Sequence, residues 1–301
     1  MIPPFATNQL FELLKSYKSS PFIVVESGGN WGDDLIYLGA KKIFNYLNIN
    51  YKVVDHHEFM ALEIPEDTVV YINGGGAFNE LWIQYPIIEF VKSVTSSAKA
   101  VIVGPTTFTI DQDFLKQRAF SKNNNTSSQK VFIFCRENIS YQTLKDIVPT
   151  NFDLLIDHDT AFNNSAEDLL KEIPHGKYKL YAIREDKEGH PIEKLDLLGL
   201  WAEPIHAPSF NEWIALHANA NKVITNRLHS SIVCSILGKN VTLLPNSYYK
   251  NRSVWEYSLK DKGVRWQENL EVSPFEKYFM KSNFYKWLAH SHKVRKSYGL
   301  I

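Results

Sequence analysis

The stretch "KVITNRLHSSIVCSILGKNVTLLP", residues 222–245, predicts a strand, a polar corner, a helix and a second strand. Its β-branched ends favour strands, and the apolar residues between them recur at helical spacing. Elements in this order form a β–α–β unit, whose two strands lie parallel in one sheet. Arg227 and His229 stand at the corner where the first strand gives way to the helix. This corner is either an ordinary strand-to-helix turn or part of a catalytic site.

The same alternation of short β-branched runs and helical stretches recurs along the chain. We expect strands over residues 21–25, 51–55, 68–73, 98–104, 130–135 and 152–157, and again over 179–183, 222–225 and 240–245. The polar stretch 163–178 between the two sets is typical of a hinge. We therefore predict an α/β fold of two Rossmann-like domains, residues 1–170 and 171–301, that face each other across a cleft. The basic, aromatic stretch 283–299 predicts a C-terminal helix that packs back on the N-terminal domain, with contact to a membrane surface as the lesser alternative.

The composition is that of a globular chain without a global electric field. The protein has 301 residues, 44% of them hydrophobic, and Lys+Arg and Asp+Glu are both 33. Balanced charge argues against nucleic acid as a partner, and any anionic ligand must be held by a few locally placed cations. Cys135 and Cys234 lie in apolar runs, which favours reduced core thiols over disulfides. With no secretion signal and no run long enough to span a bilayer, we expect a cytoplasmic protein.

Glycines, carboxylates and arginines follow the predicted strands. Ligands of open parallel sheets bind just outside the carboxyl ends of the strands, so these residues are candidates for one site. The first strand is followed by residues 26–34, "ESGGNWGDD", and the third by residues 74–80, "GGGAFNE". Such glycines permit unusual backbone conformations and leave N–H groups free for an anion or a polar ring. The alternative for the first loop is a tight turn with Asp33 or Asp34 as the helix cap.

Three arginines occupy strand ends, at Arg136, Arg184 and Arg227. A guanidinium binds a phosphate or a carboxylate with a planar fork and stays charged when desolvated. For each arginine alone, a structural ion pair is an equal alternative, whereas the three together favour an anion site. His229 starts a helix beside Arg227, where an imidazole is able to pass a proton.

Metal and serine-hydrolase chemistry are not indicated. Residues 56–58, "HHE", and 157–159, "DHD", lack a third group at ligand spacing, and neighbouring residues at a strand end point in different directions. The "DQD" of residues 111–113 is better explained as a helix cap, and no Gly-x-Ser-x-Gly elbow occurs. We therefore expect neither a metal nor another cofactor.

Seven motifs in order along the chain resemble the polysaccharide pyruvyl transferase family over residues 24–257. They are "GGNWGDDLIYLGA", "INGGGAFNELW", "CRENISYQTL", "DHDTAF", "AIRED", "TNRLHSSI" and "LLPNSYYKN", of which the Arg-Leu-His corner and the last motif are the most specific. The resemblance implies a fold like that of GT-B glycosyltransferases, with phosphoenolpyruvate as donor. It implies as acceptor a sugar of a cell-surface polysaccharide or of its nucleotide- or lipid-linked precursor. The product is a pyruvate ketal that bridges two sugar hydroxyls.

The resemblance implies Arg136, Arg227, His229 and Lys250 as donor-site residues, and the chemistry of the remaining strand-end residues suggests the other roles. Arg136, Arg227 and His229 form the donor site, in which the arginines hold phosphate and carboxylate and His229 is the general acid or base. The substrate-binding candidates are Gly28, Gly29, Asn30, Asp33, Asp34, Gly75, Gly76, Asn79, Glu80, Arg184, Ser247 and Lys250. Among them Lys250 is a further anion contact, the 28–34 loop with Asn79 or Glu80 faces the acceptor, and Asp33 or Asp34 is an alternative base. Two rival functions stay open, a GT-B-type glycosyltransferase that uses a nucleotide sugar and a non-catalytic sugar-binding protein.

Overall fold

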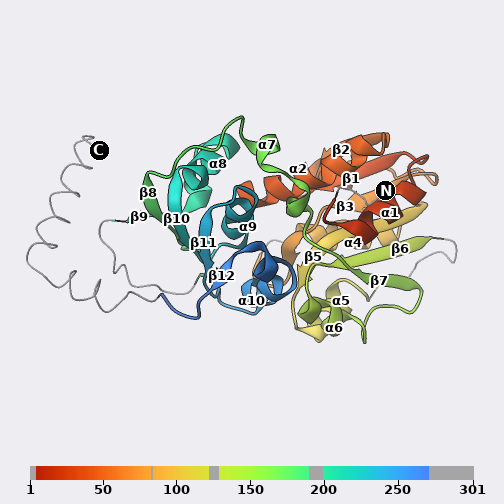
Figure 1. The fold of residues 1–301 in the computed structure, drawn as a ribbon. Helices are drawn as coiled ribbons and strands as arrows, with labels where there is room; N and C mark the ends of the chain where they lie inside the picture. The colour runs from red at the N-terminus through yellow and green to blue at the C-terminus, as the bar shows by residue number, and fades with distance from the viewer. Residues whose placement is uncertain (1–4, 83, 122–128, 190–198, 271–301) are drawn as a thin grey trace, which may run out of the picture.

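The computed structural model describes residues 5–82, 84–121, 129–189 and 199–270, and builds them into two parallel sheets (Figure 1). The predicted C-terminal helix lies outside these residues. The first sheet has the strand order β2-β1-β3-β5-β6-β7, with β4 paired to β5, and the second has the order β12-β11-β10-β8-β9. The chain is therefore α/β with parallel sheets, as the sequence predicts.

The strands of the first sheet match the predicted runs. They are β1 (Phe22–Glu26), β2 (Tyr51–Asp55), β3 (Val69–Ile72), β4 (Gly75–Phe78), β5 (Ala100–Phe108), β6 (Lys130–Cys135) and β7 (Phe152–Ile156). All of β3 and β5 is buried, as expected for parallel strands covered on both faces. The glycine run expected to be a loop instead supplies β4, because its backbone pairs with β5 at Gly75 and Phe78.

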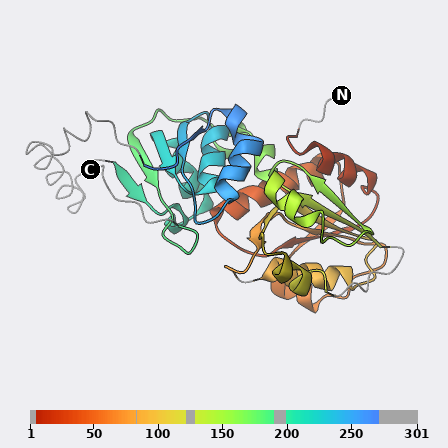
Figure 2. The same cartoon turned by 90° about the horizontal axis from the view of Figure 1, so that it is seen from below.

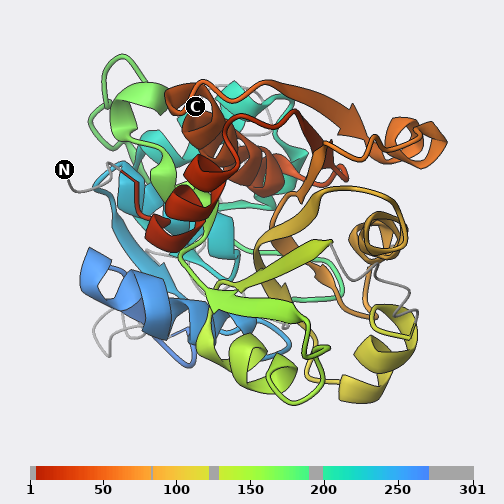
Figure 3. The same ribbon diagram turned by 90° about the vertical axis from the view of Figure 1, so that its right-hand side faces the viewer.

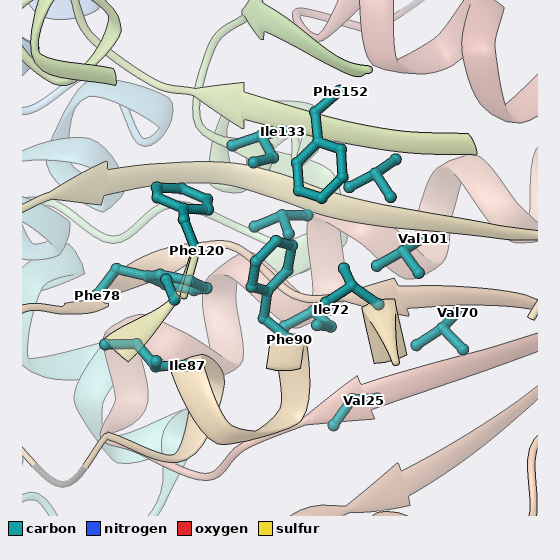
Figure 4. Packing of buried hydrophobic residues seen from close by; sticks show 14 of the residues in the cluster. Val25, Val70, Ile72, Phe78, Ile87, Phe90, Val101, Phe120, Ile133 and Phe152 are labelled. Atoms are coloured by element: carbon teal, nitrogen blue, oxygen red, sulfur yellow. The ribbon is translucent and has the colours of Figure 1, made fainter. Parts of the chain in front are cut away.

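Helices cover both faces of the first sheet (Figure 3). On one face lie α1 (Asn8–Ser16) and part of α2 (Trp31–Tyr46), whose Leu14 and Phe44 belong to one buried cluster. The other face is covered by α3 (His56–Ala61), α4 (Tyr85–Val94), α5 (Gln112–Arg118) and α6 (Asn138–Leu144). Phe90 of α4 packs there against Phe152 and Phe120, edge to face (Figure 4).

The second sheet contains β8 (Tyr178–Ala182), β9 (Leu200–Ala202), β10 (Ala220–Thr225), β11 (Asn240–Leu243) and β12 (Arg265–Trp266). On one of its faces pack α8 (Phe210–Ala218) and α9 (Leu228–Ile236), in a cluster that includes Trp213 and Ile232. The chain continues into α10 (Lys250–Val254). Short helices, η1 (Thr160–Asn163) and α7 (Ala166–Leu169), stand between the sheets in sequence, near the predicted hinge.

Helix α2 belongs to both cores. Its Leu35, Ile36 and Tyr37 pack with the core of the second sheet, whereas Ile43 and Phe44 pack with that of the first. The two sheets therefore lie side by side with α2 at their junction (Figures 1 and 2). The N-terminus of α2 is fixed by a capping box, in which Asn30 accepts from Gly32 N at 2.9 Å and Asp33 accepts from Asn30 N at 2.8 Å. Asp33 is thus part of a helix cap, as the alternative interpretation of this loop predicts.

Candidate active site

A cavity of about 430 Å³ lies where strand ends of both sheets meet. This volume is within the usual range for small-molecule sites. Its first-sheet side includes Ser27, Gly28, Gly29, Asn30, Asp33, Asn73, Gly75, Gly76, Trp82, Tyr85 and Arg136; its second-sheet side includes Arg184, Asp186, Glu188, Arg227, His229, Ser230 and Lys250. The structure therefore brings most of the predicted site residues together.

Arg136 directly follows β6 and is almost fully buried. Its Nε donates to Thr107 Oγ1 at 2.8 Å and its Nη1 donates to Asp159 Oδ2 at 2.6 Å. Burial alone would raise the pKa of Asp159, but Arg136 and the neighbouring His229 hold that pKa well below its usual range. Asp159 is therefore a fixed negative charge. Arg136 Nη2 has no hydrogen bond among the described residues and is left for a ligand.

His229 lies in the first turn of α9, as its position after Arg227 predicts. Its Nε2 is 3.5 Å from Asp159 Oδ2, and that nitrogen has no hydrogen bond within the described ranges. The N-terminus of α2 approaches the other side of the ring, because a Cβ added to Gly32 would lie 2.4 Å from His229 Nδ1. The absence of a side chain at Gly32 thus leaves room for the imidazole, which has the Asp159 carboxylate beside it.

Arg184 and Arg227 are held by carboxylates of the second sheet. Arg184 donates from Nε and Nη2 to Asp186 at 2.8 and 2.9 Å and from Nη1 to Glu188 at 2.5 Å. Arg227 donates from Nη2 to Asp186 at 2.8 Å and to Glu203 at 2.6 Å, and its Nε also bonds to Glu203. Every guanidinium nitrogen of Arg184 is therefore engaged, whereas Nη1 of Arg227 has no bond in the part of the chain that the structure describes. For Arg184 the structural ion pair is the better description.

Lys250 begins α10 and is buried beside Glu188. Its Nζ donates to the Glu188 carboxylate, which also accepts from Trp82 Nε1 at 2.6 Å. Burial lowers the pKa of Lys250 to about 8, although Glu188 partly opposes that shift. Burial would raise the pKa of Glu188, but Lys250 and Arg184 bring it to about 2. Glu188 thereby ties the first-sheet loop that carries Trp82 to two cations of the second sheet.

Two cations converge on the backbone of Gly76. A Cβ added to Gly76 would lie 3.3 Å from Arg136 Nη2 and 3.7 Å from Lys250 Nζ. Arg136 comes from the first sheet and Lys250 from the segment between β11 and β12 of the second, yet the charge of Arg136 adds to the effect of burial in lowering the pKa of Lys250. A glycine here leaves room beside both groups. This is a place where an anion finds two donors of positive charge.

Three polar atoms of buried cavity residues have no hydrogen-bond partner among the described residues. They are Asn73 Oδ1, Ser230 Oγ and His229 Nε2. Buried polar groups are nearly always paired, so unpaired atoms in residues of one cavity are unusual, although His229 Nε2 has the Asp159 carboxylate 3.5 Å away. Asn73 and Ser230 are not among the site residues that the sequence predicts, nor are the carboxylates that hold the cations, Asp159, Asp186, Glu188 and Glu203. The one sequence signal that most of these residues have in common is a position after a strand.

Four predicted substrate-binding residues do not line the cavity. Asn79 binds its own loop, bonding to Gly76 O and accepting from Leu81 N at 2.9 Å. Glu80 and Ser247 are exposed, and Asp34 stands one residue beyond the capping box. Burial and the nearby Asp33 raise the pKa of Asp34. These four therefore lie outside the residues that line the cavity.

The motifs considered for metal binding have other partners. His56 bonds to Glu89, and Asp157 accepts from Leu10 N of α1 at 2.8 Å. Within residues 5–82, 84–121, 129–189 and 199–270, no three His, Cys, Asp or Glu side chains are grouped to hold a metal ion. Nor is any helix in this part of the chain long and apolar enough to cross a membrane.

Comparison with known proteins gives a similar solved structure and a family. The crystal structure of a functionally uncharacterised protein from Klebsiella pneumoniae is similar, with a TM-score of 0.64 and 25% sequence identity. The match covers 86% of this chain and 97% of that one. Curated proteins gave no match. The family model for polysaccharide pyruvyl transferase matches residues 30–248, which include the glycines 74–76, Arg136, Arg184, Arg227 and His229. The chain therefore belongs to the polysaccharide pyruvyl transferase family.

Proposed function

We propose that the protein transfers the enolpyruvyl group of phosphoenolpyruvate to two hydroxyls of a saccharide, forming a pyruvate ketal. Family membership supports a pyruvyl transferase that acts in polysaccharide synthesis. The observation that carries the choice of donor is the convergence of Arg136 Nη2 and Lys250 Nζ on Gly76. We further propose that the two sheets belong to two Rossmann-like domains in a GT-B-like arrangement, with the cavity as the cleft between them.

The charges near the cavity suit a small trianion. Phosphoenolpyruvate carries a phosphate and a carboxylate, and guanidinium and ammonium groups bind both by charge-assisted hydrogen bonds. Arg136 and Lys250 hold the phosphate in this proposal. Arg227 Nη1, which has no bond among the described residues, is the remaining guanidinium nitrogen and takes the carboxylate. These cations supply the positive charge, so the proposal invokes no metal or other cofactor.

His229 is the proton donor to the methylene carbon of phosphoenolpyruvate. Protonation makes C3 a methyl group and leaves C2 electron-poor, so a saccharide hydroxyl adds to C2. Phosphate then leaves with the C–O bonding pair, and the second hydroxyl closes the ketal. Of the two hydroxyl protons, one replaces the proton given to C3 and the other ends on phosphate. Asp159, ionised beside Arg136, stabilises the imidazolium form of His229 between these steps.

The acceptor belongs on the first-sheet side of the cavity. Gly28 and Gly29 have φ values of +79° and +144°, which favour glycine and turn the 28–30 backbone along the cavity wall. Asp33 and Asn73 line the same wall. Hydroxyls of a saccharide match their carboxylate and amide oxygens. We therefore propose this wall as the saccharide side.

Product analysis tests the proposal. The protein is incubated with phosphoenolpyruvate and a panel of p-nitrophenyl hexosides, and phosphate release is measured beside the ketal methyl signal in NMR spectra. Nucleotide sugars replace phosphoenolpyruvate in parallel, and His229→Ala is the inactive control. We expect phosphate and ketal in equal amounts. Sugar transfer from a nucleotide sugar would establish the glycosyltransferase instead, and saccharide binding without turnover of either donor would establish a sugar-binding protein.

A further inference from the structure

A second cluster of titratable groups stands behind the saccharide wall. Ser27 follows β1 and lines the cavity, and its Oγ donates to Glu89 Oε2 at 2.5 Å. Glu89 lies on α4 with no exposed surface, and its Oε1 is 2.9 Å from Nδ1 of His56, the first residue of α3. The His56 ring stacks on Tyr85, which also lines the cavity, with centroids 3.8 Å apart.

Glu89 differs from the other buried carboxylates around the cavity. Asp159, Glu188 and Glu203 each contact an arginine or a lysine. Glu89 contacts only the Ser27 hydroxyl and the His56 imidazole, among the described residues. Burial therefore raises its pKa, although the hydrogen bonds from Ser27 and His56 partly oppose the rise. The titratable groups that face it are His56 from α3 and Tyr37 from α2.

A purely structural role does not require this carboxyl. Burying an ionisable group is costly, and a glutamine of the same length would make hydrogen bonds to Ser27 and His56 at a lower desolvation cost. A buried carboxyl one hydroxyl away from the cavity, whose pKa burial raises, is instead suited to take up and release a proton. Ser27 gives it a one-hydroxyl path to the cavity.

We propose that Ser27 and Glu89 form the proton acceptor for the saccharide hydroxyl, with His56 as the residue that positions Glu89. This inference rests on the proposed function. As the saccharide oxygen bonds to C2 of the donor, its proton passes to Ser27 Oγ while the Ser27 proton passes to Glu89 Oε2. Ser27 stays neutral and Glu89 becomes neutral. The proton later returns by the same hydroxyl to the departing phosphate, which restores the Glu89 carboxylate.

The neighbouring groups favour Glu89 over Asp33 for this role. Asp33 Oδ2 is engaged in the capping box, and the N-terminus of α2 stabilises its negative charge. Asn73 follows β3, the neighbour of β1, and its unpaired Oδ1 lies in the same wall as Ser27.

Kinetics of matched variants test the inference. Glu89→Gln and Ser27→Ala are compared with Ser93→Ala, in which the lost hydroxyl donates at 2.7 Å to the backbone oxygen of Glu89 and not to its carboxyl. We expect kcat for ketal formation to fall about 10²–10³-fold in the first two. The KM for phosphoenolpyruvate and the melting temperature should stay near wild type in Glu89→Gln. His56→Asn, which keeps a donor near the Nδ1 position, should retain more activity than His56→Phe. Full activity of Glu89→Gln would overturn the relay.

A measurement that needs no acceptor separates this inference from the proposed function. Glutamate carboxyl carbons are labelled with ¹³C, and the Glu89 signal is assigned by its loss in Glu89→Gln. We expect Glu89 to titrate above ordinary glutamates and to move higher still in Ser27→Ala, because that variant loses a hydrogen bond to the carboxylate. An ordinary titration, or one indifferent to Ser27→Ala, would refute the Ser27–Glu89 unit. If the titration is as expected but no saccharide is pyruvylated, the proposed function fails and the role of the unit in pyruvyl transfer fails with it.

Discussion

Two buried charge clusters face the same cavity and use their arginines differently. In the first, Arg136 binds Thr107 and Asp159 and keeps Nη2 without a partner among the described residues. In the second, Arg184 has bonds from all three nitrogens to Asp186 and Glu188. Both arginines directly follow a strand or stand one residue beyond it, and both are buried. An arginine at a strand end is therefore available to a ligand only when the carboxylates around it leave one of its nitrogens without a bond.

The largest expected effect comes from removal of the His229 imidazole, which lies beside Asp159 of the first cluster. His229→Ala should lower kcat/KM for phosphate release from phosphoenolpyruvate by about 10²–10⁴-fold, because it removes the general acid. The folded state should be nearly as stable as wild type in thermal unfolding. His175→Ala, at an exposed surface position, is the matched control and should behave as wild type. If kcat/KM falls only a few-fold in His229→Ala, the general acid is another residue.

Substitution of the two arginines tests the comparison directly. Arg136→Met leaves Asp159 buried beside His229 alone, so we expect the free energy of unfolding to fall by about 3–5 kcal/mol and donor binding to be lost. In Arg184→Met, Asp186 keeps Arg227 and Glu188 keeps Lys250, so the loss of stability should be smaller and donor binding should persist. Urea unfolding and calorimetric titration measure both. Equal losses of stability and of donor binding in the two variants would contradict the distinction between Arg136 and Arg184.

Gly32→Ala tests whether the position of the His229 ring matters, because the variant keeps the imidazole itself. Alanine suits the first turn of α2, but its Cβ would lie 2.4 Å from His229 Nδ1, so the ring must shift. A displacement of about 1 Å at a catalytic group is able to cost about 10²-fold in rate. We expect that loss in kcat with little change in melting temperature. An active Gly32→Ala enzyme would show that the ring position is not critical.

The lowered pKa of Lys250 predicts how donor binding depends on pH. Its ammonium form is present below about pH 8 and is lost as the pH rises through that value, since burial lowers the pKa from its usual range. Phosphoenolpyruvate affinity should therefore fall above about pH 8, by up to about tenfold per pH unit. Lys250→Arg keeps its charge throughout and should show a flat profile over the same range. A wild-type profile that is equally flat would remove Lys250 from the donor site.

The smallest effect is expected at Trp82, which contacts Glu188 of the second cluster from a loop of the first sheet. Trp82→Phe removes the indole N–H that donates to Glu188 at 2.6 Å, while Glu188 keeps Lys250 and Arg184. We expect the free energy of unfolding to fall by about 0.5–1.5 kcal/mol. The KM for phosphoenolpyruvate should change by no more than a few-fold. A much larger change in KM would mean that Trp82 itself contacts the donor.

The fold was predictable because its signals are local. The β-branched runs of β1, β3 and β6 and the apolar face of α2 are visible in the sequence, and parallel order follows from their alternation with helices. Strand β4 was missed, because its glycine-rich sequence has no strand preference and only pairing with β5 extends it. The sharing of α2 between two cores depends on tertiary packing, which local patterns do not encode.

The site was predictable as a set of strand ends but not as a set of pairs. Sequence order located Arg136, Arg227 and His229, and the structure places all three at one cavity. Sequence order did not indicate that Asp159 lies between Arg136 and His229, because these residues are distant in sequence. Nor did it indicate that every guanidinium nitrogen of Arg184 is bonded, because that depends on side-chain geometry. Nor did it indicate that the Asn79 side chain bonds back to Gly76 O of β4, because that contact depends on the pairing of β4 with β5.

The most direct test of the central claim is calorimetric titration with phosphoenolpyruvate of the wild type, Lys250→Met and His175→Ala. The claim is that Arg136 and Lys250 hold the donor anion at Gly76. It predicts saturable binding to wild type and His175→Ala, and binding weakened by at least about tenfold, or abolished, in Lys250→Met. Undiminished binding to Lys250→Met, or binding of a nucleotide sugar in place of phosphoenolpyruvate, would contradict it.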